Sequence, residues 1–385
     1  MDIKRIGILH GAILNGGDHL ICKRGTKLLE KFLGSKFELV HIKRWESFKG
    51  NFDALIIMGG PIISRSMHIQ PQRISEYINN TEIPVIALGI GISGEYFDSF
   101  DDYFTDESLK FWKKIYESSG LISVRDKQTY LLLKHFNIDA RLTGCPALFD
   151  LDNMDKMDKI FKNIKKGNIK ISLTTPSIII NIKDINFYTI HFKNFLLSIF
   201  FVTYIKLIFK LNKINGEYYL VLQHGFNHLI SIISAYCNLL RIKTVDASKR
   251  SLDEVNDIKS SDIHIGTRLH SHILFSSYRK PSYLFDVDYR TKSFLETFNC
   301  DYDINFSTSG IKKLVNLTLN ELKDDEIIND RVIKSNKAIY NYFTHMTVFL
   351  VDLKAFLDLK FDDFDYYNDT KIPLKPVTNT ASEKS

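Results

Sequence analysis

The sequence predicts an α/β protein of two domains, each with a parallel β-sheet covered by helices on both faces. Short apolar segments alternate with segments of helical periodicity, first over residues 5–143 and again over residues 169–285. This alternation is typical of strand–helix–strand units. The length of 385 residues also favours two domains, because a single hydrophobic core rarely grows that large.

The first domain is expected to cover residues 1–150. Its apolar segments have the length of buried strands, and helical patterns fill most of the gaps between them. The expected strands are 6–9, 37–42, 54–58, 85–88, 121–124 and 140–143. Asp, Lys and Asn then dominate residues 151–167, which are expected to form a linker.

The second domain is expected to cover residues 168–325. Its expected strands are 169–173, 218–223, 242–245, 263–266 and 282–285. Residues 326–360 have helical periodicity and predict a C-terminal helix long enough to return to the first domain. Residues 361–385 are polar and contain proline, so a disordered tail is expected there.

The composition is that of a soluble globular protein, with 44% hydrophobic and 25% charged residues. The net charge of +6 suits an anionic substrate or an acidic membrane surface. The lysine-rich runs of a nucleic-acid binder are missing, so no nucleic-acid partner is expected. Four widely separated cysteines form no Cys-x-x-Cys pair, which indicates neither a zinc site nor a disulfide framework.

The N-terminal residues lead into a strand and lack the apolar core of a signal peptide, so a cytoplasmic location is expected. The most apolar stretch, residues 195–211, is interrupted by Lys206 and Lys210. It is too short and too charged to span a bilayer comfortably, and we expect a helix that is buried or partly faces a membrane. Peripheral association with the inner face of the membrane therefore stays open.

Arg268 and His270 lie where a buried strand should end and a helix should begin. Residues 262–266 read as the strand, and Leu269 and Ile273 then recur at helical spacing. If the chain stays extended through residue 269, Arg268 and His270 project to one side and Leu269 to the other. A helix N-terminus directly beyond would favour an anion such as phosphate or carboxylate. The structural alternative is an ion-paired arginine beside histidines that cap the helix.

Other polar residues and glycines also follow predicted strands, where ligands of open α/β sheets bind. Asn15 and Asp18 follow the first strand, although either would also fit a helix cap. Gly59 and Gly60 follow the third strand and would let the backbone approach a ligand, although a tight turn needs them equally. These four residues are therefore candidates for substrate binding.

Arg125 and His224 end one predicted strand in each domain. Asp126 is well placed to cap the following helix, whereas Arg125 would reach a cleft between the domains. His224 follows an apolar strand, and a functional and a structural histidine fit it equally. Two facing domains with such strand ends define a cleft.

Neither a metal site nor a nucleotide-binding fingerprint is expected. Asp101 and Asp102 lack the partner aspartates that a metal site needs. The sequence contains no Gly-x-Gly-x-x-Gly or Walker motif.

The order of these motifs resembles the polysaccharide pyruvyltransferase family, over about residues 5–298. The most specific parts are the segment Ser123-Val124-Arg125-Asp126 followed by Thr143-Gly144-Cys145-Pro146, and the segment Arg268-Leu269-His270-Ser271. A strand and the run from Asp288 to Lys292 follow that segment, where the family often has an aspartate, a tyrosine and a lysine. Further matches are Asn15-x-Gly17-Asp18, Gly59-Gly60 after a strand, and Gln223-His224. One departure is Cys145, where the family commonly has aspartate.

The resemblance implies two Rossmann-like domains that face each other across a cleft in a GT-B-like arrangement. It also implies an enzyme that transfers pyruvate from phosphoenolpyruvate to a sugar as a ketal, without a metal or redox cofactor. By similarity, Arg125, His224, Arg268 and His270 would form a cationic donor site, and Lys292 would join the substrate-binding residues.

The chemistry of that reaction fits these residues. Phosphoenolpyruvate carries a carboxylate and a phosphate, and a guanidinium matches both. Ketal formation needs a proton for the methylene carbon and a base for the sugar hydroxyl, tasks that suit a histidine. His270 and His224 are therefore the expected catalytic residues. The expected acceptor is a saccharide or lipid-linked oligosaccharide of capsule, exopolysaccharide or lipopolysaccharide synthesis.

Two alternatives stay open. One is a GT-B glycosyltransferase that uses a nucleotide-activated sugar, whose phosphates would need the same cationic strand ends. The other is an inactive binding subunit of the same fold, a reading that Cys145 in place of aspartate keeps open.

Overall fold

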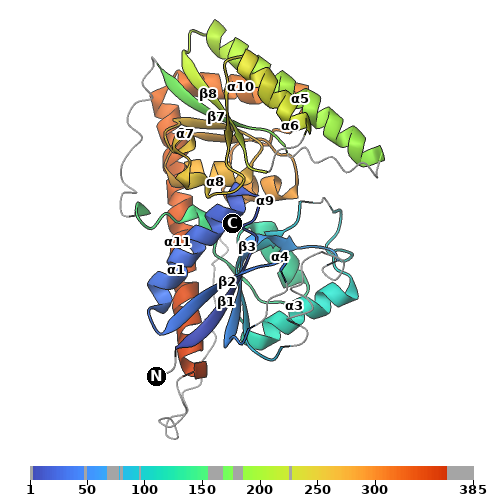
Figure 1. Ribbon diagram of the computed structural model, residues 1–385, viewed down its shortest axis with the longest axis vertical. Helices are drawn as coiled ribbons and strands as arrows, with labels where there is room; N and C mark the ends of the chain where they lie inside the picture. Colours follow the sequence, from blue (N-terminus) through green and yellow to red (C-terminus); the bar gives the residue numbers. More distant parts are fainter. Residues whose placement is uncertain are drawn as a thin grey trace, which may run out of the picture.

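The computed structural model describes residues 3–46, 50–66, 78, 81–94, 97–154, 168–176, 185–224 and 228–361, with side chains left undescribed at 185–190. In these residues the strands form two sheets, of six and five strands, and all neighbouring strands are parallel (Figure 1). The predicted α/β class with parallel sheets is confirmed.

The first sheet has the strand order β2-β1-β3-β4-β5-β6. Its strands are β1 (Lys4–His10), β2 (Phe37–Lys43), β3 (Ala54–Ile63), β4 (Val85–Ile92), β5 (Ile122–Val124) and β6 (Arg141–Leu142). The helices of this unit are α1 (Gly16–Leu33), α3 (Asp106–Ser119), α4 (Lys127–His135) and the short 3₁₀ helix η2 (Pro146–Leu148). Strands β3 and β4 are almost continuously apolar and buried, as expected for central parallel strands with helices on both faces.

The second sheet has the order β11-β10-β7-β8-β9. Its strands are β7 (Ile169–Thr174), β8 (Gly216–Leu222), β9 (Lys243–Asp246), β10 (Ile263–Gly266) and β11 (Ser282–Leu284). Its helices are α5 (Ile185–Leu211), α6 (His228–Leu239), η4 (Leu252–Glu254), α7 (Asn256–Lys259), α8 (Leu269–Ser277), α9 (Tyr289–Thr297) and α10 (Thr308–Leu322).

The long helix α11 (Asp325–Phe361) runs beside both units (Figure 1). Near its start, Ile328 and Val332 belong to the hydrophobic core of the second sheet. Further along, Met346 and Phe349 belong to the core that contains α1 and the first sheet. The helix therefore fastens one unit to the other. The domain boundaries stay predictions, and most of the predicted linker (155–167) and tail (362–385) lie outside the described residues.

The two units also share a hydrophobic core directly. Leu20 and Leu28 of α1 belong to the same buried cluster as Leu274 and Phe275 of α8. Burial of apolar surface at about 25 cal/mol per Å² makes such a shared core a strong connection between the units. This contact positions the N-termini of α1 and α8 relative to each other.

Among the described helices, α5 has a segment, His191–Leu211, whose length and composition would suffice to cross a membrane. Its inner face packs on the second sheet, where Phe201, Val202 and Ile205 are fully buried. Only 33% of the most apolar window is buried inside the protein, so much of the helix surface faces outward.

Candidate functional site

A cavity of about 460 Å³ lies between the two units, at the carboxyl ends of strands from both sheets. The first unit contributes Asn15, Asp18, Pro61 and Arg125. The second unit contributes Pro176, Lys193, Asn194, Gln223, His224, Thr267, Arg268, Leu269, His270, Asp286, Val287, Asp288, Arg290, Thr291, Asn305, Phe306 and Ser307. Six predicted site residues therefore line one space, namely Asn15, Asp18, Arg125, His224, Arg268 and His270.

The N-terminus of α1 is held against the second unit. The Oδ1 atom of Asn15 accepts a hydrogen bond from the backbone N–H of Gly17 at 2.9 Å, so Asn15 caps the helix as the sequence allowed. The backbone of Asn15 also forms a β-bridge with His224, and Gly16 N–H donates to the carbonyl of Gln223 at 3.1 Å. Asn15 thus caps a helix and lines the cavity at the same time.

Gly17 packs against the imidazole ring of His270. A Cβ atom at position 17 would lie 2.4 Å from Nδ1 of His270, about 1 Å closer than ordinary contact allows. The first turn of α1 and the first turn of α8 meet at this point, so the glycine sets where the histidine can sit.

We expect Gly17→Ala to lower kcat/KM by about a hundredfold, because a misplacement of about 1 Å at a reacting group costs that much. The matched control is Gly25→Ala on the same helix, where a Cβ atom would lie 2.2 Å from Sδ of Met58, away from the cavity. Thermal unfolding and kinetics of both variants separate the two effects. If both substitutions changed turnover equally, Gly17 would be important for folding alone.

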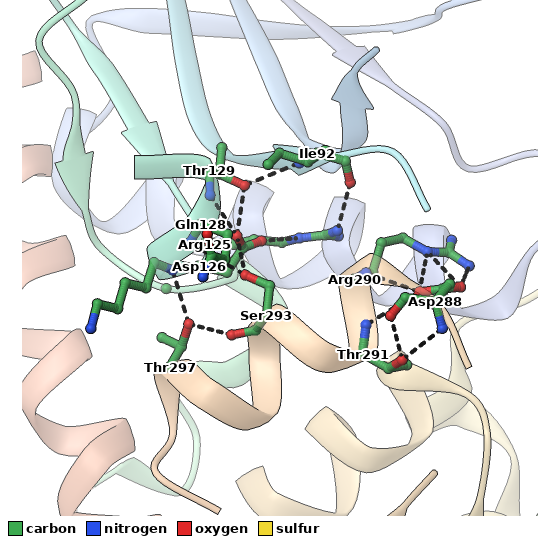
Figure 2. A network of polar contacts seen from close by, with 12 residues as sticks. Ile92, Arg125, Asp126, Gln128, Thr129, Asp288, Arg290, Thr291, Ser293 and Thr297 are labelled. Carbon is green, nitrogen blue, oxygen red and sulfur yellow. Dashed lines mark hydrogen bonds and ion pairs between the residues drawn. The ribbon is translucent and has the colours of Figure 1, made fainter. Parts of the chain in front are cut away.

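Arg125 reaches the cavity from the end of β5. It is 1% exposed. Its Nε atom donates to Oδ2 of Asp126 at 3.2 Å and its Nη2 atom donates to the carbonyl of Ile92 at 3.3 Å (Figure 2). The remaining Nη1 atom has no hydrogen-bond partner among the described residues. A buried cationic donor of this kind is costly unless a ligand satisfies it.

Arg268 occupies the N-cap position of α8, and its backbone N–H donates to Oγ1 of Thr174 at 3.2 Å. Within the part of the chain that the structure describes, its guanidinium forms no ion pair. Burial and the nearby Arg290 lower the pKa of Arg268, while Asp288 opposes the shift. A bound anion would relieve this unfavourable environment of the guanidinium.

Arg290 is a third cation of the cavity. It forms an ion pair with Asp288, with Nε 3.1 Å and Nη2 2.5 Å from Oδ2 (Figure 2). Asp288 and Thr291 form a capping box that starts α9 and places Arg290 in its first turn. This spacing of aspartate and threonine was the available sequence signal for Arg290, and the prediction chose Lys292 instead.

Both predicted catalytic histidines line the cavity. Burial and the charge of Arg125 lower the pKa of His270 well below its usual value. Burial and Arg268 lower the pKa of His224 to about 3. Both imidazoles are therefore neutral at pH 7. The Nε2 atom of His270 is buried and has no partner among the described residues.

Asp18 is a further carboxylate of the cavity, in addition to the ion-paired Asp288. Burial raises its pKa, and the charges of Arg44 and Arg290 oppose this shift. Arg44 lies behind the cavity, where its Nη2 atom donates to the carbonyls of Met58 and Gly59 at 3.1 Å each. No sequence pattern marks Arg44, which lies in a turn after β2.

Contacts across the two units hold Arg125 in place. The Oδ1 atom of Asp126, which caps α4, accepts from Ser293 Oγ at 2.7 Å (Figure 2). The backbone N–H of Lys127 donates to Oγ1 of Thr297 at 2.9 Å. Hydroxyl groups of α9 thus satisfy free N–H and carboxylate groups at the N-terminus of α4, close to the cavity.

Comparison with known proteins shows the family to which the chain belongs. A sequence model of the family described as "Polysaccharide pyruvyl transferase" matches residues 15–289. The chain belongs to the polysaccharide pyruvyl transferase family. It is accordingly an enzyme of that kind, and its acceptor is a polysaccharide or sugar. No curated protein sequence matches the chain significantly.

Solved structures show the same fold at low sequence identity. S. aureus MnaA in complex with UDP has a TM-score of 0.56 and 13% identity, over 92% of this chain and 97% of that one. A putative UDP-N-acetylglucosamine 2-epimerase from Listeria monocytogenes has a TM-score of 0.56 and 12% identity, over 93% and 98%. UDP-GlcNAc 2-epimerase from Neisseria meningitidis has a TM-score of 0.54 and 11% identity, over 90% and 100%. These similarities confirm the predicted GT-B-like fold.

Three predicted binding residues of this pyruvyl transferase lie outside the cavity lining. Lys292 is exposed, since it sits two residues after Arg290 and therefore on another face of α9. Gly59 and Gly60 have left-handed φ angles of 48° and 82° within β3. A Cβ atom at Gly59 would lie 2.4 Å from Ile21, so these glycines make room for α1 and for Arg44.

Cys145, where the family commonly has aspartate, is fully buried in the core shared by the two units. Burial raises the pKa of its thiol to about 11, so the thiol is neutral. Cys145 is absent from the cavity lining, although the charge of Arg125 acts on its thiol and opposes the rise in pKa.

A group of His10, Cys22 and His41 has potential metal ligand atoms within 4.8 Å of one another. Burial and neighbouring charges, including that of Arg44, lower the pKa of His10 to about 4. A cation would meet the same repulsion from Arg44. The group is not part of the cavity lining, and we assign it no role in transfer.

Proposed function

We propose that this pyruvyl transferase takes its pyruvyl group from phosphoenolpyruvate and attaches it as a ketal to a sugar of a cell-surface polysaccharide. The supporting observation is a set of three buried polar atoms on one cavity that have no partner among the described residues. They are Nη1 of Arg125, Nε2 of His270 and Oγ1 of Thr267. Native proteins rarely leave such atoms unsatisfied, so a ligand with several oxygen atoms fits them.

Phosphoenolpyruvate has two anionic ends, and the cavity has more than one cationic contact for them. Arg125 enters from the first unit, and Arg268 and Arg290 from the second. Planar guanidinium groups pair with carboxylate and phosphate in bidentate geometry. The N-terminus of α8, which begins directly after Arg268, adds backbone N–H groups and a positive dipole end.

Transfer requires proton movements that the cavity's own groups can perform. The methylene carbon of the donor gains a proton, a sugar oxygen bonds to the neighbouring carbon, and the phosphate leaves as a second sugar hydroxyl closes the ketal. His270 is the proposed proton donor. His224 and the Asp18 carboxylate are the proposed acceptors of hydroxyl protons. This scheme uses no metal ion and no redox cofactor.

The acceptor is proposed to be a saccharide or lipid-linked oligosaccharide of capsule, exopolysaccharide or lipopolysaccharide synthesis. The second unit also lines the cavity with neutral hydrogen-bonding side chains, those of Gln223, Asn305 and Ser307. Such groups bind sugar hydroxyls. Because intracellular phosphoenolpyruvate is the proposed donor, we place the reaction in the cytoplasm or at the inner face of the membrane.

Thermal unfolding in excess EDTA tests the donor. Phosphoenolpyruvate at about a hundred times its Kd should stabilise the folded protein by about 2.7 kcal/mol and raise Tm. UDP-sugars and CDP-sugars should leave Tm unchanged. Transfer to an acceptor should then proceed in the same EDTA buffer, with release of one phosphate for each pyruvyl group.

Stabilisation by a nucleotide sugar, together with a strict need for Mg²⁺ or Mn²⁺ and release of a nucleoside diphosphate, would contradict this proposal. Such a result would favour the glycosyltransferase alternative. A protein that binds no donor of either type would instead be a binding subunit of the same fold.

A further inference from the structure

The outer surfaces of α5 and α6 form an exposed apolar face, which we call the α5–α6 face. Its large exposed side chains are Phe192, Leu196, Leu207, Leu211, Ile232 and Leu239. Phe192, Leu196 and Leu207 repeat at helical spacing on one side of α5. The two helices lie side by side on the second unit, where the hydroxyls of Thr203 and Tyr236 are 2.8 Å apart (Figure 1).

This exposure is unusual for helices of such composition. The most apolar window of α5 is only 33% buried, although a core helix of the same sequence would be mostly enclosed. Leu211 is 68% and Leu239 is 82% exposed. A contiguous apolar surface of this kind marks an interaction site.

The charged residues of the two helices have one sign. Residues 185–211 and 228–239 contain no aspartate or glutamate. Lys210 and Lys213 are exposed at the C-terminal end of α5, and Arg241 is exposed just after α6. An apolar helix face flanked by lysine and arginine is typical of a helix that lies in the interface of a membrane with anionic lipids.

The N-terminal part of α5 also borders the cavity. Lys193 and Asn194, which directly follow Phe192 on α5, line the cavity. With Phe192 and Leu196 against a membrane, the cavity would lie on another side of the same helix turns, within about 10 Å of the lipid headgroups. That is where the sugar of a lipid-linked acceptor would be presented.

We propose that the α5–α6 face docks the enzyme peripherally on an anionic membrane, so that the cavity receives a lipid-linked sugar acceptor. The docking itself follows from the face alone. Only the identity of the acceptor rests on the proposed pyruvyl transfer. The alternative is that a second copy of this chain covers the face. A dimer would bury the apolar side chains, but it would not need the exposed Lys210, Lys213 and Arg241 beside them.

Vesicle flotation of the intact protein tests this docking. Protein should bind phosphatidylcholine vesicles that contain phosphatidylglycerol, and bind pure phosphatidylcholine vesicles much more weakly. The double variant Leu196→Gln with Leu207→Gln should lose at least about tenfold in the partition coefficient, because two large apolar groups no longer enter the interface. Lys210→Gln with Lys213→Gln should lose about fivefold per lysine on the anionic vesicles alone.

The matched control is Val348→Gln with Val351→Gln, which changes two exposed apolar residues on α11, away from α5. It should bind vesicles as the unchanged protein does. Light scattering should show that the α5 variants and the unchanged protein have the same oligomeric state. A dimer that the α5 substitutions dissociate, without vesicle binding, would assign the face to a second copy and overturn the proposal. Equal vesicle binding by all variants would also overturn it.

The vesicle-binding results do not depend on which donor the enzyme uses. Vesicle binding is measured without phosphoenolpyruvate or acceptor, whereas the donor is tested by thermal unfolding without vesicles. Membrane docking with no effect of phosphoenolpyruvate on Tm would leave the α5–α6 face as a membrane surface and reject the donor. The reverse result would keep the donor and reject the docking surface.

Discussion

Replacing Arg268 by alanine is expected to weaken phosphoenolpyruvate binding by at least about thirtyfold, equivalent to about 2 kcal/mol. Its guanidinium lines the cavity, and among the described residues it has no carboxylate partner that would hold it away from a ligand. The pKa of Arg268 is lowered by burial and by Arg290, which indicates that an anion is needed to offset the charge. Isothermal titration calorimetry of the variant with phosphoenolpyruvate measures the loss directly.

Arg268→Lys should recover little of this affinity, since a point charge cannot replace a planar fork on carboxylate or phosphate. Arg5→Ala is the control for loss of one arginine, because Arg5 pairs with Glu38 on the first sheet and is not part of the cavity lining. Near-normal affinity and turnover in Arg268→Ala would remove Arg268 from the donor site.

The sequence was sufficient to bring most cavity residues together because parallel strands share one ligand-binding edge. Arg125 follows β5, His224 follows β8 and Arg268 follows β10, and all three line the same cavity. Each could be placed from a strand pattern and one turn of chain beyond it. The two series of predicted strands also indicated two sheets whose ligand-binding edges face each other.

Residues whose role depends on contacts between distant segments could not be placed in this way. Gly59 and Gly60 looked like a ligand-binding loop, but β3 continues through them to Ile63, and they make room for Ile21 and Arg44. Conversely, Gly17 fits a helix start by sequence, and only the folded chain shows that it packs on His270. No local pattern reports a contact between residues 17 and 270.

The side of a helix on which a residue lies was a second feature that the sequence did not predict. The prediction of Lys292 rested on the resemblance to the family, which does not show the side of α9 on which a residue lies. Lys292 lies two residues after Arg290, and two residues turn a side chain by about 200° around the helix. The apolar composition of α5 likewise predicted a buried or membrane-facing helix without deciding which side is covered. Packing against the second sheet decides this, and it leaves Leu196 and Leu207 outside.

Replacing His270 by glutamine is expected to lower kcat by about 10²–10⁴-fold while donor affinity changes much less. Glutamine keeps a hydrogen-bonding group near the position of Nε2 but cannot accept and return a proton near neutral pH. In the structure the pKa of His270 is held well below its usual value by burial and by Arg125. The negative charge of a bound donor would counter the charge of Arg125 and directly favour the protonated imidazole, so phosphoenolpyruvate should raise that pKa and permit protonation close to the methylene carbon.

Single-turnover kinetics with and without saturating donor, and NMR titration of the His270 imidazole, measure these two effects. Without donor the imidazole should stay neutral as the pH falls from about 8 to 5, and with donor it should become protonated within that range.

The matched control is His272→Gln on the same helix. His272 hydrogen-bonds Ser282 through Nδ1 at 2.8 Å and does not line the cavity, so this change should lower Tm but leave kcat within a few-fold. If His270→Gln lost donor affinity but kept kcat, His270 would be a phosphate ligand and not the proton donor. The proton donor would then be Asp18 or His224, the two other cavity residues proposed for proton transfer.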